Sequence, residues 1–223
     1  MGYLKWLGHA AFEVEIDGVK IFFDPWIDNP MSPVKLKDVT KADLIFVTHD
    51  HGDHLGNVIE ISKKTGAKIV AIFDLCEALK KECSSIECID MNIGSLVELN
   101  GLKVAITPAF HSGFHGHPVG FVVKGKETSI YHAGDTCLFK DMEIIGEIYK
   151  PEIALLPIGG WYTMGPYEAA YAVKLIKPKI AIPMHYKTFP VIKGSPEEFK
   201  KYVEDLYPAT RVIILKPGEK IEF

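Results

Sequence analysis

Five side chains that can bind metals or carry protons stand close together near residue 50. The segment VTHDHGDHLG, residues 47–56, holds three histidines and two aspartates in the six positions from His49 to His54. It follows the apolar run ADLIFVT, which is typical of a strand buried on both faces. A loop that leaves the end of a rigid strand can direct several side chains into one cavity. The segment therefore predicts a metal site.

The spacing within the segment indicates two metal ions rather than one. His49 and His51 are two residues apart and can face the same way. Asp53 and His54 follow the flexible Gly52 and can turn towards a second point. A single histidine is more often a hydrogen-bonded core or surface residue than a ligand, but three histidines and an aspartate in this spacing reverse that expectation.

Further ligand-type residues stand at the ends of three later apolar strands. His111 closes ITPAFH, Asp135 closes SIYHAGD and His185 closes IAIPMH. Each is ambiguous alone, because an aspartate at a strand end commonly forms an Asx-turn or caps a helix. Their number favours one site where the strand ends converge. The predicted ligands are His49, His51 and His111 for one metal, Asp53, His54 and His185 for the other, and Asp135 as the bridge.

Such a site has the chemistry of a hydrolase. Two divalent ions about 3.5 to 4 Å apart lower the pKa of a bridging water towards about 7. The resulting hydroxide can attack a carbonyl or phosphoryl centre, while Asp53 orients it and accepts its proton. No serine or cysteine nucleophile is then required. Imidazole-rich ligands make zinc the first choice, and manganese, nickel or iron would also be accepted.

The order of the expected elements explains how these residues are positioned. Hairpin strands come first, joined by a tight turn at Asp17–Gly18, and strand and helix then alternate. A second set of hairpins turns at Asn100–Gly101 before the alternation returns. Two such halves, meeting near residue 100, predict a single α/β domain over residues 1–223. We expect two mixed β-sheets packed face to face with helices outside.

Composition excludes several other classes. The formal charge is -4, and a protein that holds a nucleic-acid backbone usually shows a broad basic surface, so no nucleic acid is expected. Arg211 is the only arginine, so any anion must be held by lysine, backbone or metal. No apolar run approaches the roughly 20 residues needed to cross a bilayer.

The cysteines and the N-terminus favour a cytoplasmic protein with reduced thiols. The four cysteines show no C-x-x-C spacing, and the first residues lack the pattern of a signal peptide. Cys76 and Cys83 lie seven apart in a helix-like segment and are interpreted as small buried hydrophobes. Cys137 is likewise expected to be a buried thiol.

The pattern H-x-H-x-D-H followed by His, Asp and His resembles the metallo-β-lactamase superfamily. The resemblance covers the whole chain, and all five motif regions of the superfamily have a match. It implies a four-layer αββα sandwich, in agreement with the order of elements above. It also implies that Asp24, in KIFFDPW, orients the loop and the ligands from outside the metal's own coordination shell.

A narrower likeness lies in WLGHAAFEVEIDG, AGDT, GGWYTMGPYEAAYAV and PMHYKTFP. These segments resemble a branch of metal-dependent hydrolases similar to L-ascorbate-6-phosphate lactonase and N-acyl-phosphatidylethanolamine phospholipase D. The resemblance implies that His9 lies beside the metals and, with Asp53, takes part in catalysis; the alternative is a strand-end histidine hydrogen-bonded to backbone. Trp161 departs from the branch, where a polar residue often follows GG.

The expected function is therefore hydrolysis of a small lactone, ester or phosphodiester. The alternatives are a non-hydrolytic di-iron redox protein on the same fold, which typically has Glu where His51 stands, and a binding or sensing module with structural metals. The substrate and any homo-oligomer are left open.

A few polar residues near the motifs have less definite roles. His115 and His117 flank an expected active-site loop and either touch substrate or act as an acid, or are simply solvated. Lys187 either holds an anionic group or is an ordinary surface lysine. His132 is expected in the sheet interior or beside a ligand. Asp50 is expected to point away, towards the following helix or solvent.

Overall fold

The computed structural model describes residues 2–223, and its strands form two sheets of seven strands each. Contacts within the chain divide it into two compact units. Unit 1 comprises the chain up to Gly94 together with Ser112–Pro118 and Leu215–Phe223; unit 2 comprises Ser95–His111 and Val119–Ile214. Each unit contains one of the sheets. The single domain expected from the sequence stays a prediction.

The sheet of unit 1 has the order β14-β1-β2-β3-β4-β5-β6. Its strands are β1 (Tyr3–Trp6), β2 (Phe12–Ile16), β3 (Val19–Phe23), β4 (Leu44–Phe46), β5 (Lys68–Ile72), β6 (Cys88–Met91) and β14 (Lys220–Glu222). The first hairpins pair antiparallel, whereas β3, β4, β5 and β6 run parallel. Asp17 and Gly18 both have positive φ, as a two-residue hairpin turn requires, so the predicted turn is confirmed.

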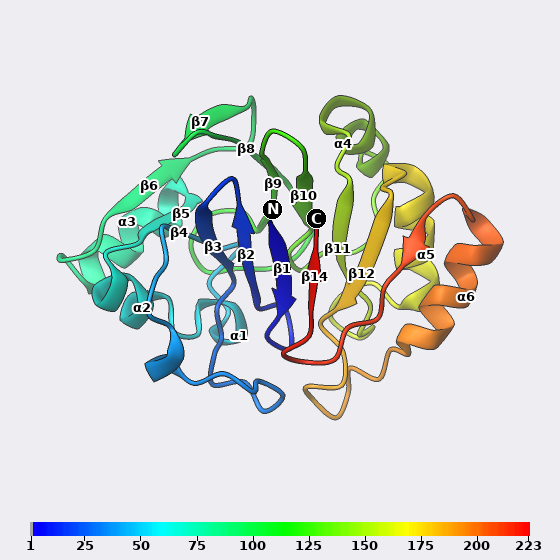
Figure 1. The fold of residues 1–223 in the computed structure, drawn as a ribbon, viewed down its shortest axis with the longest axis horizontal. Helices are drawn as coiled ribbons and strands as arrows, with labels where there is room; N and C mark the ends of the chain where they lie inside the picture. The colour runs from blue at the N-terminus through cyan, green and yellow to red at the C-terminus, as the bar shows by residue number, and fades with distance from the viewer. Residues whose placement is uncertain (1) are drawn as a thin grey trace. The chain divides into compact units, whose positions relative to one another are not determined.

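The helices of unit 1 follow its parallel strands. They are the 3-10 turn η1 (Leu36–Asp38), α1 (Gly52–Leu55), α2 (Val58–Thr65) and α3 (Phe73–Glu82). Helix α2 buries Val58 and Ile61 on one face and ends at Gly66, whose left-handed φ of 76° closes the last turn. Helices α2 and α3 contact β5, and α3 also contacts β6 (Figure 1).

The sheet of unit 2 has the order β13-β12-β11-β10-β9-β8-β7. Its strands are β7 (Val97–Leu99), β8 (Leu102–Pro108), β9 (Val119–Lys124), β10 (Ser129–His132), β11 (Ile153–Pro157), β12 (Ile180–Met184) and β13 (Arg211–Val212). Strands β10 to β13 are parallel, so the carboxyl ends of β10, β11 and β12 meet at one edge. The turn predicted at Asn100–Gly101 joins β7 to β8, with both residues at positive φ.

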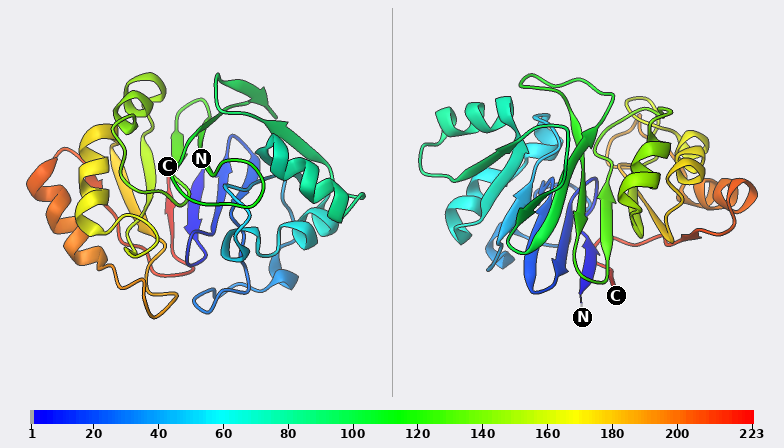
Figure 2. Two further views of the ribbon diagram at one scale, coloured as in Figure 1. Left: turned by 180° about the vertical axis from the view of Figure 1, so that it is seen from behind. Right: turned by 90° about the horizontal axis from the view of Figure 1, so that it is seen from above.

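Three helices accompany this second sheet. They are α4 (Met142–Tyr149), α5 (Pro166–Ile176) and α6 (Pro196–Leu206). Helix α5 contacts β11 and both other helices, and α6 packs against α5 (Figure 2). Pro166 and Pro196 stand at the first helical position, where the missing N–H costs no hydrogen bond. Ser195 caps α6 by accepting from the amide of Glu198.

Strand β14 shows where the sequence pattern failed. Residues 220–222 read Lys-Ile-Glu, which is too short and too charged to stand out as a strand. In the structure β14 pairs antiparallel with β1, and the amide of Gly2 donates to the carbonyl of Phe223 over 2.8 Å. The two ends of the described chain therefore lie side by side in unit 1 (Figure 1).

The expectation of reduced, buried thiols is wrong. Cys76 and Cys88 form a disulfide that joins α3 to β6, with 5.7 Å between their Cα atoms. Cys83 is half-buried and Cys137 is exposed. The pairing arises because α3 packs back on β6, a contact that no cysteine spacing reveals. In residues 2–223, no helix has the length and apolar character needed to cross a membrane.

Candidate metal centre

The predicted ligands stand at strand ends in both units. In unit 1, β4 ends at Phe46, His49 and His51 occupy the following segment, and Asp53 and His54 lie on α1. In unit 2, Asp135 follows β10 and His185 follows β12. Because β10 and β12 belong to the same parallel set, these two side chains leave the sheet at the same edge.

Asp24 organises the proposed ligands that belong to unit 1. Its carboxylate is fully buried at the end of β3. Oδ1 accepts from the Thr48 amide over 2.8 Å, and Oδ2 accepts from the Thr48 hydroxyl over 2.7 Å. Nδ1 of His54 also lies 2.7 Å from Oδ2. Since a carboxylate only accepts, Nδ1 of His54 donates and its Nε2 carries the lone pair.

Thr48 fixes the tautomer of His49 in a similar way. Its hydroxyl proton is directed to Asp24, so its oxygen is left to accept from Nδ1 of His49, 3.0 Å away. Nε2 of His49 then carries the lone pair. The buried chain from Asp24 through Thr48 therefore fixes both histidines in the tautomer that binds a metal through Nε2.

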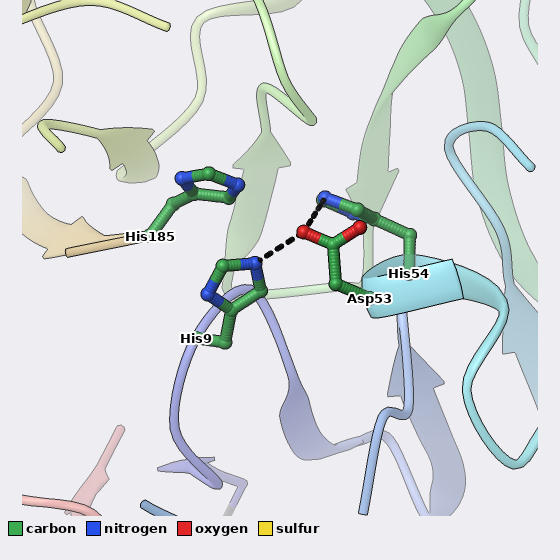
Figure 3. Close-up of side chains that lie close together, drawn as sticks. All are labelled: His9, Asp53, His54 and His185. Carbon is green, nitrogen blue, oxygen red and sulfur yellow. Dashed lines mark hydrogen bonds and ion pairs between the residues drawn. The ribbon is translucent and has the colours of Figure 1, made fainter. Parts of the chain in front are cut away.

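His9 contacts the carboxylate of Asp53. Its ring is completely buried, and its Nε2 lies 2.9 Å from Oδ2 of Asp53 (Figure 3). The backbone of His9 is left-handed, with φ of 52°, and its carbonyl accepts from the indole N–H of Trp6. Potential ligand atoms of His9, Asp53 and His54 lie within 4.8 Å of one another. The ring of His9 therefore contacts a predicted ligand, and its place beside the metals stays a prediction.

The ring of His49 contacts the rings of both His51 and His54. Nε2 of His49 lies 3.0 Å from Nδ1 of His51. The ring centroids of His49 and His54 are 4.1 Å apart. These imidazoles pack closely with no apolar residue between them. They therefore bring several nitrogen ligand atoms together in a small volume.

In unit 2, the proposed ligands His111 and His185 lie close to the carboxylate of Asp135. Oδ2 of Asp135 lies 3.0 Å from Nε2 of His185 and 3.6 Å from Nε2 of His111. Both Asp135 and His185 are buried. The neighbouring Thr136 accepts from the amide of Phe110 over 3.0 Å, which ties the segment before His111 to the end of β10.

The backbone at His185 depends on a glycine that the sequence did not single out. His185 has a left-handed φ of 56°. A Cβ on Gly159 would lie 2.2 Å from the carbonyl oxygen of His185, so only glycine fits beside that turn. Burial raises the pKa of the adjacent Tyr186 hydroxyl to about 12. Gly159 is the first residue of the GG pair before Trp161.

The expectation that Asp50 points to solvent or to the following helix is wrong. Its carboxylate is buried and accepts three bonds from one loop of unit 1: the amide of Phe114 over 2.8 Å, the amide of His115 over 2.9 Å, and Nδ1 of His115 over 2.8 Å. The reason is that residues 112–118 fold back onto the metal-ligand segment, a long-range contact without a sequence pattern.

The remaining residues named from sequence lie in different surroundings. His132 is completely buried, and its Nδ1 accepts from the amide of Gly134 over 3.2 Å. Lys187 and His117 are exposed. Trp161 is 77% exposed and has a left-handed φ of 64°.

Known proteins resemble this chain along its whole length. The family model described as "Beta-lactamase superfamily domain" matches residues 19–186. A "UPF0173 metal-dependent hydrolase" of Caldivirga maquilingensis is 58% identical over 98% of this chain and 97% of its own. One of the same name from Staphylothermus marinus is 57% identical over 100% of both.

A solved structure shares the fold. A metallo hydrolase from the hyperthermophilic archaeon Ignicoccus hospitalis superimposes with a TM-score of 0.94 at 44% identity, over 100% of this chain and 99% of that one. The four-layer αββα class predicted from the sequence is thereby confirmed, as is the superfamily resemblance. The chain belongs to the beta-lactamase superfamily and, within it, to the family of the UPF0173 metal-dependent hydrolases.

Proposed function

We propose that the chain is a dinuclear metal-dependent hydrolase of a small lactone, ester or phosphodiester. The observation that carries the proposal is the buried chain from Asp24 through Thr48, which leaves Nε2 of His49 and His54 as lone-pair atoms. Such an arrangement orients imidazoles for metal binding and raises their basicity as ligands. The names of the relatives, all metal-dependent hydrolases, agree with it.

The donor set fits divalent transition metals. The proposed ligands are the seven residues His49, His51, Asp53, His54, His111, Asp135 and His185. Five imidazoles and two carboxylates suit zinc best, and manganese, nickel or iron remain compatible. When bound, such ions supply an acidified water and positive charge for the developing oxyanion.

The chain's own residues then position the attacking water and accept its proton. Asp53 orients the attacking water and accepts its proton, as its carboxylate lies on α1 among the histidines. His9 holds that carboxylate through the 2.9 Å contact with Oδ2. The tight His9–Asp53 contact keeps the base in one orientation, which matters because a small misplacement of a catalytic group costs rate.

The location of the protein is proposed to be cytoplasmic. The Cys76–Cys88 disulfide would argue against this in most organisms, because cytoplasmic thiols are kept reduced. Intracellular proteins of hyperthermophiles are an exception and are rich in disulfides. The structural relative from a hyperthermophilic archaeon supports that reading.

The test is metal analysis of the purified protein coupled to a screen of lactones, esters and phosphodiesters, with and without chelator. We expect close to two ions per chain and a hydrolysis that chelator abolishes and zinc restores. Hydrolysis that is indifferent to chelation would contradict the proposal. Two bound ions without turnover of any probe would favour structural metals, and two irons with oxygen-dependent oxidation would favour the redox alternative.

A matched pair of variants sharpens this experiment. Asp135→Ala removes the proposed bridging carboxylate and should lower both metal content and hydrolysis. Asp141→Ala removes an aspartate that precedes α4 and makes no side-chain cap hydrogen bond, so both should remain. An Asp135→Ala protein that kept both ions and full activity would overturn the ligand assignment.

A further inference from the structure

Residues 112–118, Ser-Gly-Phe-His-Gly-His-Pro, form a loop that belongs to unit 1 although both flanking segments belong to unit 2. We call it the Phe114 loop. Its tip presents Phe114 with 80% of the side chain exposed, the largest exposure among the large apolar residues of the described chain. A single exposed apolar side chain is ordinary on a protein surface, so the surroundings of Phe114 decide what it can do.

The Phe114 loop is held in a defined conformation. Asp50 accepts from two consecutive amides, those of Phe114 and His115, and from Nδ1 of His115, all within 2.9 Å. The side chain of Asp50 is only 4% exposed. A buried carboxylate with three charge-assisted hydrogen bonds fixes the backbone on both sides of the Phe114 carbonyl.

Two glycines, one on each side of the residues bound to Asp50, allow the loop to pack closely against its neighbours. A Cβ on Gly113 would lie 3.2 Å from Oδ1 of Asp50. Gly116 has a left-handed φ of 73°, and a Cβ there would lie 2.8 Å from the side chain of Ile72, just before α3. The loop therefore approaches its neighbours closely at both points. The backbone conformation that these contacts hold places the Phe114 side chain on the surface.

This geometry sets Phe114 beside a proposed metal ligand. Its ring centroid lies 5.9 Å from that of His51, in an edge-to-face arrangement, within the same unit. Asp50 stands between His49 and His51 in the chain, so one residue couples the ligand segment to the loop. An exposed aromatic edge at this distance from a ligand can touch a substrate bound there.

We propose that Phe114 forms an apolar wall of the substrate site, that it selects substrates with an apolar or aromatic group next to the scissile bond, and that Asp50 is its positioning residue. The inference rests on the proposed hydrolase function. It narrows the substrate class from any small lactone, ester or phosphodiester to those that carry such a group.

Kinetics on paired probes test the role of Phe114. The pairs differ by a phenyl group: γ-butyrolactone and γ-phenyl-γ-butyrolactone, methyl acetate and phenyl acetate, and the methyl and phenyl esters of 4-nitrophenyl phosphate. For the class that the wild type hydrolyses, Phe114→Ala should raise KM for the phenyl probe about tenfold, while kcat and the KM of the small probe change little. Ile93→Ala removes another exposed apolar side chain of unit 1 and should change neither.

Two outcomes separate the inference from the function on which it rests. If the wild type hydrolyses the probes but Phe114→Ala changes both members of a pair equally, the specificity role is wrong and the hydrolase function stands. If the wild type hydrolyses no probe of any class, the function fails and the specificity role fails with it.

Hydrogen exchange tests Asp50 without reference to activity. Asp50→Asn replaces one acceptor oxygen by an NH₂ group that faces the loop donors, so amides in residues 112–118 should exchange faster than in the wild type. The same substitution should raise KM for the phenyl probe more than it lowers kcat. Wild type stripped of metal serves as the control for any loss of ligands. Exchange no faster than in that control would overturn the positioning role.

Discussion

At the scale of single residues, the centre depends on protons whose positions are set by buried partners. Asp24 is a pure acceptor, so the Thr48 hydroxyl and Nδ1 of His54 must both donate to it. Thr48 in turn can only accept from His49. Two imidazoles are thereby committed to one tautomer before any metal arrives. His9 exerts a separate control on Asp53.

Thr48→Val tests the tautomer argument, because valine keeps the shape and removes the hydroxyl. Without that acceptor His49 loses its fixed orientation, and we expect metal affinity to fall about 10- to 100-fold. Competition against a fluorescent chelator measures it. Thr65→Val, which removes a hydroxyl bonded to the carbonyl of Ile61, should leave affinity unchanged. Equal affinities for wild type and Thr48→Val would refute the argument.

His9 is tested with two substitutions of different hydrogen-bonding capacity. His9→Ala removes the contact with Asp53, and kcat should fall about 100-fold or more while both ions stay bound. His9→Gln can still donate to the carboxylate. Partial recovery of kcat in His9→Gln would identify His9 as a positioning residue, and a kcat unaltered in either variant would remove it from the mechanism.

At the scale of elements, the parallel strands place ligands at a shared edge, and tight turns hold those ligands in place. Strands β10, β11 and β12 end together, and His185 turns with left-handed backbone directly after β12. The turn after β11 must leave room for it, which is the role of Gly159. Another constraint joins elements in unit 1, where the disulfide fastens α3 to the edge strand β6.

Gly159→Ala is expected to destabilise the protein through a steric clash. The new Cβ would lie 2.2 Å from the His185 carbonyl, so the backbone at the ligand must shift. Overpacking of this kind costs about 1 to 3 kcal/mol, measured by denaturant unfolding. Gly94→Ala, at a position with open space and without positive φ, is the matched control. Equal stabilities of the two variants would show that the turn adapts.

Loss of the disulfide should also lower stability. Cys88→Ser frees a bridge that spans 12 residues, and the chain-entropy model puts its contribution at about 3 kcal/mol. Thermal unfolding without reductant compares it with Cys83→Ser, which alters a cysteine outside the bridge. If reductant lowered the melting temperature of Cys88→Ser as much as that of the wild type, the bridge would not be the cause.

At the scale of the whole molecule, metal binding and folding are coupled. Any ligand that binds only the native chain stabilises it by mass action, by about 2.7 kcal/mol at a free concentration 100 times its Kd. The proposed ligands come from seven positions spread from His49 to His185. An ion held by such a set binds the unfolded chain far more weakly than the native one.

Removing the metal should therefore lower the melting temperature, and zinc should restore it. Scanning calorimetry with and without chelator measures the difference. His111→Ala should reduce that difference, whereas His117→Ala, which alters an exposed histidine outside the proposed set, should preserve it. A melting temperature independent of chelator in the wild type would contradict the coupling.

Local chemistry decided what the sequence could determine alone. The two-residue turns at Asp17–Gly18 and Asn100–Gly101 need positive φ, so they can be predicted from residue type. Buried parallel strands such as β4, β11 and β12 read as continuous apolar runs, since both of their faces are covered. Most of the proposed ligands follow such strands. The class of fold could be anticipated from them, and the position of the centre stays a prediction.

Tertiary structure alone decided the features that depend on distant partners. The sequence predicted no structural role for Asp50, because its partners, Phe114 and His115, lie more than 60 positions away in the chain. The Cys76–Cys88 bridge needs α3 to fold back on β6, and β14 becomes a strand only by pairing with β1. In each case the partner that stabilises the feature lies in a distant segment of the chain, so local residue type and spacing do not predict it.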